Sequence, residues 1–333
     1  MNMSEPTQFI DASLRGEMRY DVPMSRHTSW RAGGLAQRMY RPADLADLQQ
    51  FLRQLPADEP LIAVGLGSNL LVRDGGLRGT VLLMHSALSE LRMGGDAIYA
   101  QAGVPGAKLA RFAASNNLCG AEFFAGIPGT LGGMLAMNAG CYGSETWQKV
   151  QRVQVLTRSG ELLQRTPQEY EIGYRHVALR EKGEGGRENG GEAAREGFTL
   201  LPSPLSLPDE EFFVAAWLRF EQGDVEAARL EIKALMEKRS ASQPLQLPNA
   251  GSVFRNPPGN HAAKLIEGCG LKGKRSGGAQ VSEKHANFIV NVGDATAADI
   301  ENLINEVRAT VLQQTGTDLH PEVKIIGEYA NHE

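Results

Sequence analysis

Residues 125–143, AGIPGTLGGMLAMNAGCYG, constrain the fold of this chain more than any other stretch. The stretch contains six glycines and no charged side chain. Glycines at this density let a backbone approach a ligand closely and adopt positive φ angles. The apolar run 131–137 predicts a helix whose free N–H groups face the preceding Gly-Thr turn, and such a helix start favours phosphate groups. Two interpretations have equal weight here: a phosphate site for a dinucleotide cofactor, or a tight buried turn beside a closely packed helix.

Length and charge narrow the class of protein. A chain of 333 residues is long for a single core, so two or three domains are expected. Lysine and arginine number 34 against 39 aspartate and glutamate, which gives a net charge of -5. This balance argues against a general nucleic-acid binder, although a local basic cluster can still bind an anionic substrate.

Cysteine usage and hydropathy indicate the compartment. The chain has three cysteines without CxxC spacing, which predicts neither a disulfide framework nor a metal knuckle and fits a reducing compartment. The first 20 residues lack a continuous apolar segment, and no run of about 18 apolar residues follows. We therefore expect a cytoplasmic protein without a signal peptide, a membrane span or a bound metal.

Hydrophobic periodicity and capping residues locate the secondary structure. Helices are predicted at 44–55, 106–117, 224–239, 260–268 and 296–314, with a short one after the capping box at 166–169. Strands are predicted at 61–64, 80–84, 97–102, 153–157, 162–164, 212–220, 287–292 and 322–326. Helices and strands mix without regular alternation, so the fold class is α+β.

Residues 182–197, KGEGGRENGGEAAREG, contain no large apolar side chain. Such a segment cannot bury enough surface to offset the entropy of ordering, so we interpret it as a mobile loop. A lid or a partner site is the functional alternative.

A second glycine motif, GLGSNLLV, occupies residues 65–72 after a predicted strand. Leu70 stands where a third glycine would complete a dinucleotide fingerprint, so the motif is weak evidence by itself. Gly65, Gly67, Ser68 and Asn69 still form a plausible backbone nest for a diphosphate. No Walker motif is present, which argues against an NTPase.

Seven motifs, taken together and in order, give a more specific signal. They are HTSWRAGG (27–34), GLGSNLLV (65–72), the stretch 125–143, GYR (173–175), PNAGSVFRNPPG (248–259), GLKGKRSGGAQVSEKHANFIVN (270–291) and HPEVKIIG (320–327). This set resembles the UDP-N-acetylenolpyruvoylglucosamine reductases, flavoenzymes that make UDP-N-acetylmuramate for bacterial peptidoglycan. The amino-acid sequence of the 270–291 motif is similar to that of the second of the family's two types.

The resemblance implies a fold and a domain order. It implies an FAD-binding fold of the vanillyl-alcohol-oxidase (PCMH) type, in which two subdomains hold non-covalent FAD and a third, α+β domain binds the substrate. We expect FAD subdomains at 1–85 and 86–222, the second with the 182–197 insertion, and a substrate domain at 223–323. The C-terminal tail 324–333 is expected to return to the first subdomain.

The resemblance also implies the cofactor contacts and the cycle. The expected FAD contacts are Gly65, Gly67, Ser68, Asn69, Leu70, Ala125, Gly126, Ile127, Gly129, Thr130 and Gly133. NADPH would reduce the flavin and leave, and the sugar nucleotide would then enter the same cavity. One shared cavity would explain why the chain lacks a second nicotinamide motif.

The family's catalytic positions fall on Arg175, Ser252 and Glu322. Negative charge builds next to the substrate carboxylate as hydride adds to the enolpyruvyl group, and Arg175 can stabilise it with planar, charge-assisted hydrogen bonds. Glu322 can assist if it is protonated, which requires a raised pKa. Ser252 would donate the proton, a demanding role for a hydroxyl. Taken singly, Arg175 would be a surface ion-pair partner, Ser252 a turn residue and Glu322 a strand-edge residue.

Three further residues are predicted to bind substrate. Tyr174 would line the pocket, Asn256 would contact the sugar nucleotide, and Lys274 would meet its diphosphate, with a solvated basic turn as the alternative. His285 could be an acid, but we favour a structural hydrogen bond. The serine or aspartate expected shortly after Arg175 is absent, which leaves open how the arginine loop is held.

Two rival functions remain at this stage. One is another FAD-linked oxidase of the same fold, acting on alcohols or 2-hydroxy acids, and the other is a sugar-nucleotide-binding regulator without catalysis. The intact arginine, serine and glutamate set favours the reductase. Such an enzyme would serve cell wall biogenesis, cell shape and cell division, as a monomer or weak oligomer.

Overall fold

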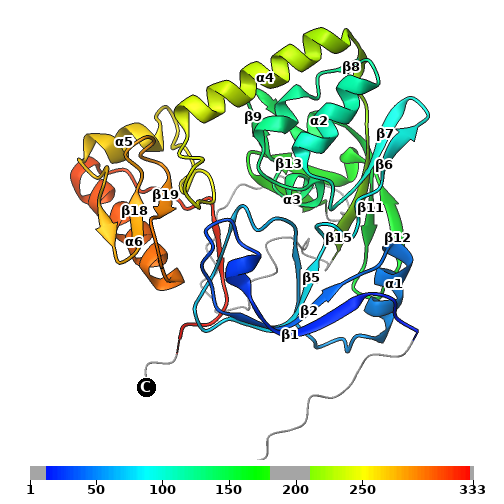
Figure 1. Ribbon diagram of the computed structural model, residues 1–333, viewed down its shortest axis with the longest axis horizontal. Helices are drawn as coiled ribbons and strands as arrows, with labels where there is room; N and C mark the ends of the chain where they lie inside the picture. The colour runs from blue at the N-terminus through cyan, green and yellow to red at the C-terminus, as the bar shows by residue number, and fades with distance from the viewer. Residues whose placement is uncertain (1–12, 181–210, 331–333) are drawn as a thin grey trace, which may run out of the picture.

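The computed structural model describes residues 13–180 and 211–330, and the predicted loop at 182–197 lies outside them (Figure 1). The N-terminal part of this range forms a four-stranded sheet in the order β1-β2-β5-β3. β1 is antiparallel to β2, whereas β5 is parallel to both of its neighbours. The bounds are β1 (Glu17–Pro23), β2 (Leu35–Arg41), β3 (Leu61–Val64) and β5 (Leu77–Leu83), with η1 (Met24–Arg26) between the first two.

Helix α1 (Leu45–Gln54) covers this sheet at the predicted place. Its N-cap Asp44 accepts a hydrogen bond from the Asp47 backbone N–H, which satisfies one of the free donors at the helix start. The apolar face packs on the sheet, where Tyr40 and Phe51 stack with ring centroids 3.9 Å apart.

A second sheet follows in the order β12-β11-β15-β7-β6, with antiparallel neighbours throughout. Its strands are β6 (Leu91–Gly94), β7 (Ala97–Gln101), β11 (Val150–Leu156), β12 (Leu162–Arg165) and β15 (Phe212–Leu218). The helices on it are α2 (Gly106–Ser115), η2 (Glu122–Gly126), α3 (Leu131–Ala136), η3 (Thr146–Lys149) and η4 (Pro167–Glu169). Short pairs complete this part: β8 (Leu118–Cys119) with β16 (Glu221–Gln222), β9 (Gly140–Cys141) with β10 (Ser144–Glu145), and β13 (Tyr170–Gly173) with β14 (His176–Leu179).

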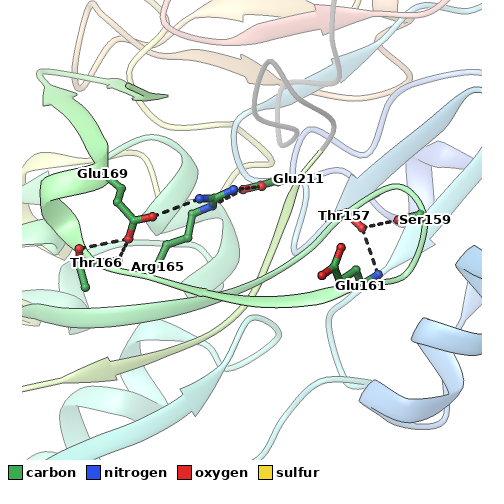
Figure 2. A network of polar contacts seen from close by, with 7 residues as sticks. All are labelled: Thr157, Ser159, Glu161, Arg165, Thr166, Glu169 and Glu211. Atoms are coloured by element: carbon green, nitrogen blue, oxygen red, sulfur yellow. Dashed lines mark hydrogen bonds and ion pairs between the residues drawn. The ribbon is translucent and has the colours of Figure 1, made fainter. Parts of the chain in front are cut away.

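A polar network ties the second sheet to the chain on either side of residues 181–210 (Figure 2). Arg165 at the end of β12 forms an ion pair with the buried Glu211 and a second with Glu169, the latter at 3.1 Å. The Arg180 backbone N–H donates to the Glu169 carbonyl at 2.8 Å. Arg180 and Glu211, the described residues that border 181–210, are therefore both held near the end of β12 and η4.

The C-terminal part forms a third sheet, β17-β18-β19, covered by two helices. Its elements are α5 (Ala262–Gly268), β17 (Arg275–Ser276), β18 (Ala279–Val281), β19 (Ile289–Asn291) and α6 (Ala297–Thr315). The helix α6 begins after the N-cap Thr296, whose side chain forms a capping box with Asp299, and it ends at Gly316, which adopts a left-handed conformation with φ 71°.

The final strand returns to the N-terminal region. β20 (Lys324–Ile326) pairs in parallel with β4 (Leu70–Val72), the strand that follows the first glycine motif. The third sheet is also anchored there, because Asp74 accepts hydrogen bonds from the N–H groups of Ala297 and Ala298 at the start of α6. The buried Trp30 indole donates to the Ile289 carbonyl at 2.7 Å. The third sheet and α6 are thus held against the N-terminal region.

Helix α4 (Val225–Ser242) spans the space between the second and third parts (Figure 1). The sequence predicts an amphipathic helix that opens a new domain, but Ala228 is its only buried residue. The helix contacts η2, α2 and β8, which belong with the second sheet. A helix that bridges two parts needs no continuous apolar face, which explains the difference. The domain boundaries themselves stay predictions.

The fold is α+β, as predicted. The predicted helices and strands are present within a few residues, and the sequence analysis did not predict β1, β2 or the β13–β14 hairpin. No helix in the ranges 13–180 and 211–330 combines the length and apolarity needed to cross a membrane.

Candidate active site

A cavity of about 300 Å³ lies between the two glycine motifs. Its walls come from residues 62–70, from 126–141, from the β13–β14 turn, from the end of α4 and from the β20 region. Arg175, Ser252 and Glu322 all line it, together with these predicted FAD contacts: Gly65, Gly67, Ser68, Asn69, Leu70, Gly126, Ile127, Gly129, Thr130 and Gly133. The fold therefore brings the predicted catalytic residues and both glycine motifs to one place.

The first glycine motif presents free backbone donors. The described hydrogen bonds include none donated by the backbone N–H groups of residues 65–69. Gly67 adopts φ +61°, and a Cβ at this position would lie 2.0 Å from the His27 carbonyl oxygen. Only glycine fits here, and the loop it permits lines the cavity with N–H groups that are available to an anionic group.

The second glycine motif differs from the prediction in one respect. The N–H groups of Leu131 and Gly132, at the start of α3, donate to the carbonyls of Val104 and Ala102 at 2.9 and 2.8 Å. These two donors are therefore not available to a phosphate, whereas no hydrogen bond donated by the Gly133 N–H is among those described. The reason is tertiary: the chain leaving β7 runs beside the helix start and satisfies its donors.

Gly133 contributes open space to the cavity. A Cβ built on Gly133 would meet no atom within 4 Å, and the residue lines the cavity. The glycine thus keeps open space where a side chain would project. Together with the apolar Ile127, Met134 and Met137, this opening fits a flat, largely apolar group such as the flavin that the resemblance implies.

Ser252 and Glu322 are neighbours because their segments pair. The Glu322 backbone N–H donates to the Val253 carbonyl at 2.7 Å, and the Arg255 N–H donates to the His320 carbonyl at 2.9 Å. Gly251, at φ +78°, turns the chain into this pair. The Ser252 hydroxyl has no hydrogen-bond partner among the described residues, so it is free to contact a ligand.

Asn69 links the first glycine motif to Glu322. Its side-chain amide donates to the Glu322 carbonyl at 3.1 Å, and its own carbonyl accepts from the Lys324 N–H at 3.0 Å. The predicted cofactor contact Asn69 and the backbone of the predicted catalytic residue Glu322 therefore share one hydrogen-bonded unit.

Arg175 occupies the turn of the β13–β14 hairpin. It adopts φ +55°, a left-handed conformation that costs a non-glycine residue roughly 1–3 kcal/mol. The buried Asn138, from the second glycine motif, donates to the Gly173 carbonyl at 3.1 Å and so fixes the turn. The hairpin ladder and this amide hold the arginine loop without the serine or aspartate whose absence the sequence shows.

Arg175 and Glu322 form an ion pair across the cavity, with Nε and Oε1 2.5 Å apart. Both side chains are largely buried, at 18% and 11% exposure. Burial raises the pKa of Glu322, although the charges of Arg175 and Arg255 lower it. A carboxyl group with a raised pKa in a closed site can hold a proton and donate a hydrogen bond.

The other predicted site residues lie outside the cavity walls. Lys274 forms an ion pair with Glu306 of α6 at 2.8 Å, and the Asn256 side chain accepts from the Ala262 N–H at the start of α5. Ala125 is buried in the core of the second sheet. Tyr174 is 52% exposed beside Arg175, whose guanidinium lies 5.3 Å from the ring centroid.

His285 does not make the structural hydrogen bond that we favoured. Its Nδ1 is buried without a partner among the described residues, and its ring packs edge-on against Phe288. Burial lowers its pKa, which favours the neutral imidazole.

Sequence reasoning missed two cations in the cavity wall, Lys324 and Arg239. Lys324 follows Glu322 by two residues in a strand, so the period of two could have placed both on one face. Burial and the charge of Arg255 lower its pKa. No sequence pattern indicates that Arg239 is a site residue, because only the tertiary position of α4 brings it to the cavity.

Replacing Gly67 with alanine is expected to weaken FAD binding at least about tenfold, since left-handed strain alone reaches that size and the Cβ would also displace the His27 backbone. The measurement is flavin content after purification and titration of the stripped protein with FAD. Gly95→Ala is the matched control, because Gly95 has φ +74° with no atom within 4 Å of a Cβ. Equal FAD affinity in the Gly67 variant and wild type would contradict the assignment.

Comparison with known proteins agrees with this geometry. A family model described as "UDP-N-acetylenolpyruvoylglucosamine reductase, C-terminal domain" matches residues 243–326, and one described as "FAD binding domain" matches residues 36–165. The chain is 55% identical over 339 residues to the UDP-N-acetylenolpyruvoylglucosamine reductase of Nitrosospira multiformis, covering 100% of this chain and 95% of that protein. It is 53% identical to the same-named protein of Thiobacillus denitrificans, covering 95% and 94%. The crystal structure of the reductase from Thermus caldophilus superimposes with a TM-score of 0.73 at 27% identity, covering 94% of this chain and 99% of that one.

Proposed function

This chain belongs to the UDP-N-acetylenolpyruvoylglucosamine reductases, and we propose that Arg175, Ser252 and Glu322 carry out its reaction in the cavity between the glycine motifs. The enzyme is FAD-dependent and uses NADPH to reduce UDP-N-acetylglucosamine enolpyruvate to UDP-N-acetylmuramate, a peptidoglycan precursor. Nothing in the comparisons favours the oxidase alternative. The observation that carries the proposal is the convergence of these three side chains on one cavity lined by both motifs.

The cofactor is held mainly by backbone. Residues 65–69 offer free N–H groups, and Gly133 leaves room for the ring system. When bound, FAD supplies the hydride that adds to the methylene carbon of the enolpyruvyl group. The protein's own contribution is to orient the substrate, to stabilise the negative charge that results and to deliver a proton.

Arg175 and Glu322 act on the substrate carboxylate. Hydride addition places negative charge on the carbon next to that carboxylate, and the Arg175 guanidinium can meet the delocalised charge with two parallel hydrogen bonds. In the ligand-free protein this guanidinium is paired with Glu322. An entering carboxylate competes for Arg175 and adds negative charge beside Glu322, so we infer that Glu322 takes up a proton when substrate binds.

Ser252 completes the reaction by proton donation. Its hydroxyl is unpartnered among the described residues and lies in the cavity wall, on the segment that pairs with Glu322. A hydroxyl is a weak acid, but the carbanion next to a carboxylate is a strong base, so the transfer is favourable in the transition state.

The role of Glu322 predicts a pH dependence for flavin reoxidation by substrate. Because the raised pKa keeps Glu322 protonated to higher pH than usual, the rate is expected to fall as pH rises through that pKa. Glu322→Gln keeps a neutral donor, so its lower rate should not show this fall. The charged groups that act on Glu322 are Arg175 and Arg255, and burial together with the charge of Glu322 raises the pKa of the neighbouring Tyr174 above its usual value. Stopped-flow reoxidation measured across pH would test this, and an identical pH fall in the glutamine variant would assign it to another group.

The overall activity is tested by NADPH oxidation with and without the enolpyruvyl sugar nucleotide. A flavin-containing protein whose NADPH oxidation accelerates with this substrate, and which forms UDP-N-acetylmuramate, fulfils the expectation. Oxidation at an unchanged rate would contradict the assigned reaction.

We also propose the cellular setting. A precursor of peptidoglycan made from nucleotides places the enzyme in the cytoplasm, where it would support cell wall biogenesis, cell shape and division. The described cysteines are all free, which agrees with a reducing compartment. We propose a monomer or weak oligomer, which light scattering on the purified protein would test.

A further inference from the structure

Arg239 stands apart from the other charged residues of α4. It lies in the last turn of the helix and lines the cavity, half-buried, whereas most of the helix is exposed. Arg229 pairs with Glu226 at 2.8 Å, and Lys233 lies 3.9 Å from Glu237, so these cations are neutralised on the helix surface.

Arg239 has no such partner. Among residues 13–180 and 211–330, no carboxylate forms an ion pair with it, and its Nε donates only to the Gln243 side chain at 3.0 Å. Burial lowers its pKa, and its closest ionisable neighbours are Tyr142 and Cys141. Burial raises the pKa of Cys141 to about 11, so this thiol is neutral and does not compensate the charge. A buried cation without a counter-ion is unfavourable unless a ligand supplies the anion.

The position of Arg239 is fixed by contacts of α4 with the second glycine motif. The Tyr142 hydroxyl donates to the Leu235 carbonyl at 3.1 Å, and the Lys238 ammonium lies 5.5 Å from the centre of the Tyr142 ring. These contacts hold the last turns of α4 beside residues 140–142, which border the cavity. These contacts place the guanidinium at the cavity.

The two glycine motifs supply no positive charge to the cavity. The motifs 65–72 and 125–143 contain no charged side chain, yet FAD, NADPH and the sugar nucleotide each carry a diphosphate. Building on the proposed function, we propose that Arg239 binds a diphosphate in this cavity and supplies the positive charge that the two glycine motifs lack. A guanidinium suits this task because its planar donors match phosphate oxygens in pairs.

The test compares Arg239→Gln, Arg239→Lys and the control Arg229→Gln in the full-length protein. FAD affinity is measured by fluorescence titration of the flavin-stripped protein, and NADPH and sugar-nucleotide affinities from the two half-reactions of the flavin-loaded protein. Arg239→Gln is expected to weaken one of these affinities about 10- to 100-fold, Arg239→Lys to weaken it less, and Arg229→Gln to behave as wild type. Thermal unfolding of all three variants verifies folding.

The three affinity measurements identify which ligand Arg239 binds. Weaker FAD binding assigns the diphosphate to the cofactor, whereas unchanged FAD binding with weaker NADPH or sugar-nucleotide binding assigns it to the exchangeable ligands. Wild-type affinities in Arg239→Gln, or equal losses in Arg229→Gln, would overturn the proposal. Should wild type fail to turn over the sugar nucleotide, the proposed function fails, while the FAD titration still decides the role of Arg239.

Discussion

The Ser252→Ala variant is expected to be reduced by NADPH at the wild-type rate and to be reoxidised by the enolpyruvyl substrate at least about 100-fold more slowly. General acid catalysis contributes roughly 10²- to 10⁴-fold in enzymes, and no other hydroxyl lines the cavity on the segment paired with Glu322 among the described residues. The half-reactions separate the two effects, because reduction by NADPH requires no proton from Ser252. Both rates are read from the flavin absorbance in a stopped-flow instrument.

The control for this prediction is a serine outside the cavity. Ser115, whose hydroxyl donates to the Arg111 carbonyl on the exposed surface of α2, is expected to tolerate alanine in both half-reactions. A Ser252→Ala enzyme with normal turnover would exclude the proton-donor role. Equal slowing of both half-reactions would instead indicate damage to flavin binding.

The sequence predicts the glycine motifs and the catalytic residues because these depend on short patterns. Local signals also place α6, where the capping box at Thr296 and the glycine at 316 mark both ends. The occupied donors at the start of α3 could not be predicted in this way. They are occupied by the carbonyls of Ala102 and Val104, which follow β7 about thirty residues earlier in the chain. No local sequence pattern indicates that these carbonyls lie beside the start of α3.

The cations at the cavity show the same limit. Lys274 is basic and lies in a motif, but Glu306 on α6 neutralises it away from the cavity. Arg239 lies in an unremarked helix, and only the packing of α4 against the second glycine motif brings it to the ligand space. Residue type indicates what chemistry is available, whereas tertiary contacts decide which charge remains unpaired.

Two segments far apart in the sequence, which carry Arg175 and Glu322, must meet before the proposed site exists. Arg175 comes from a hairpin held by Asn138 of the second glycine motif, and Glu322 from a segment held by Asn69 of the first. The ion pair therefore joins the two halves of the cofactor cavity. In the proposed mechanism a substrate carboxylate replaces Glu322 as the partner of Arg175.

Replacing Arg175 with glutamine is expected to slow reoxidation by substrate about 100- to 1,000-fold, the usual effect of removing a group that stabilises an oxyanion. Arg175→Lys keeps the charge but loses the planar pair of donors, so it is expected to recover only part of the rate. Reduction by NADPH should change much less, since it creates no charge at the carboxylate. Stopped-flow measurement of both half-reactions tests this, and a lysine variant with the wild-type rate would show that charge alone suffices.

The same substitution has a stability consequence with a definite pH dependence. Without Arg175, Glu322 loses the positive charge that lowers its pKa, so the carboxyl pKa rises further above its unfolded value. A group whose pKa is raised in the folded state loses stabilisation as pH increases through that pKa. The loss of unfolding free energy in Arg175→Gln should therefore approach about 3 kcal/mol above the raised pKa of Glu322 and be smaller below it, where the carboxyl is protonated. The double variant with Glu322→Gln is expected to regain the stability at high pH but not the turnover, whereas a pH-independent loss in the single variant would show that Glu322 is not the group left uncompensated.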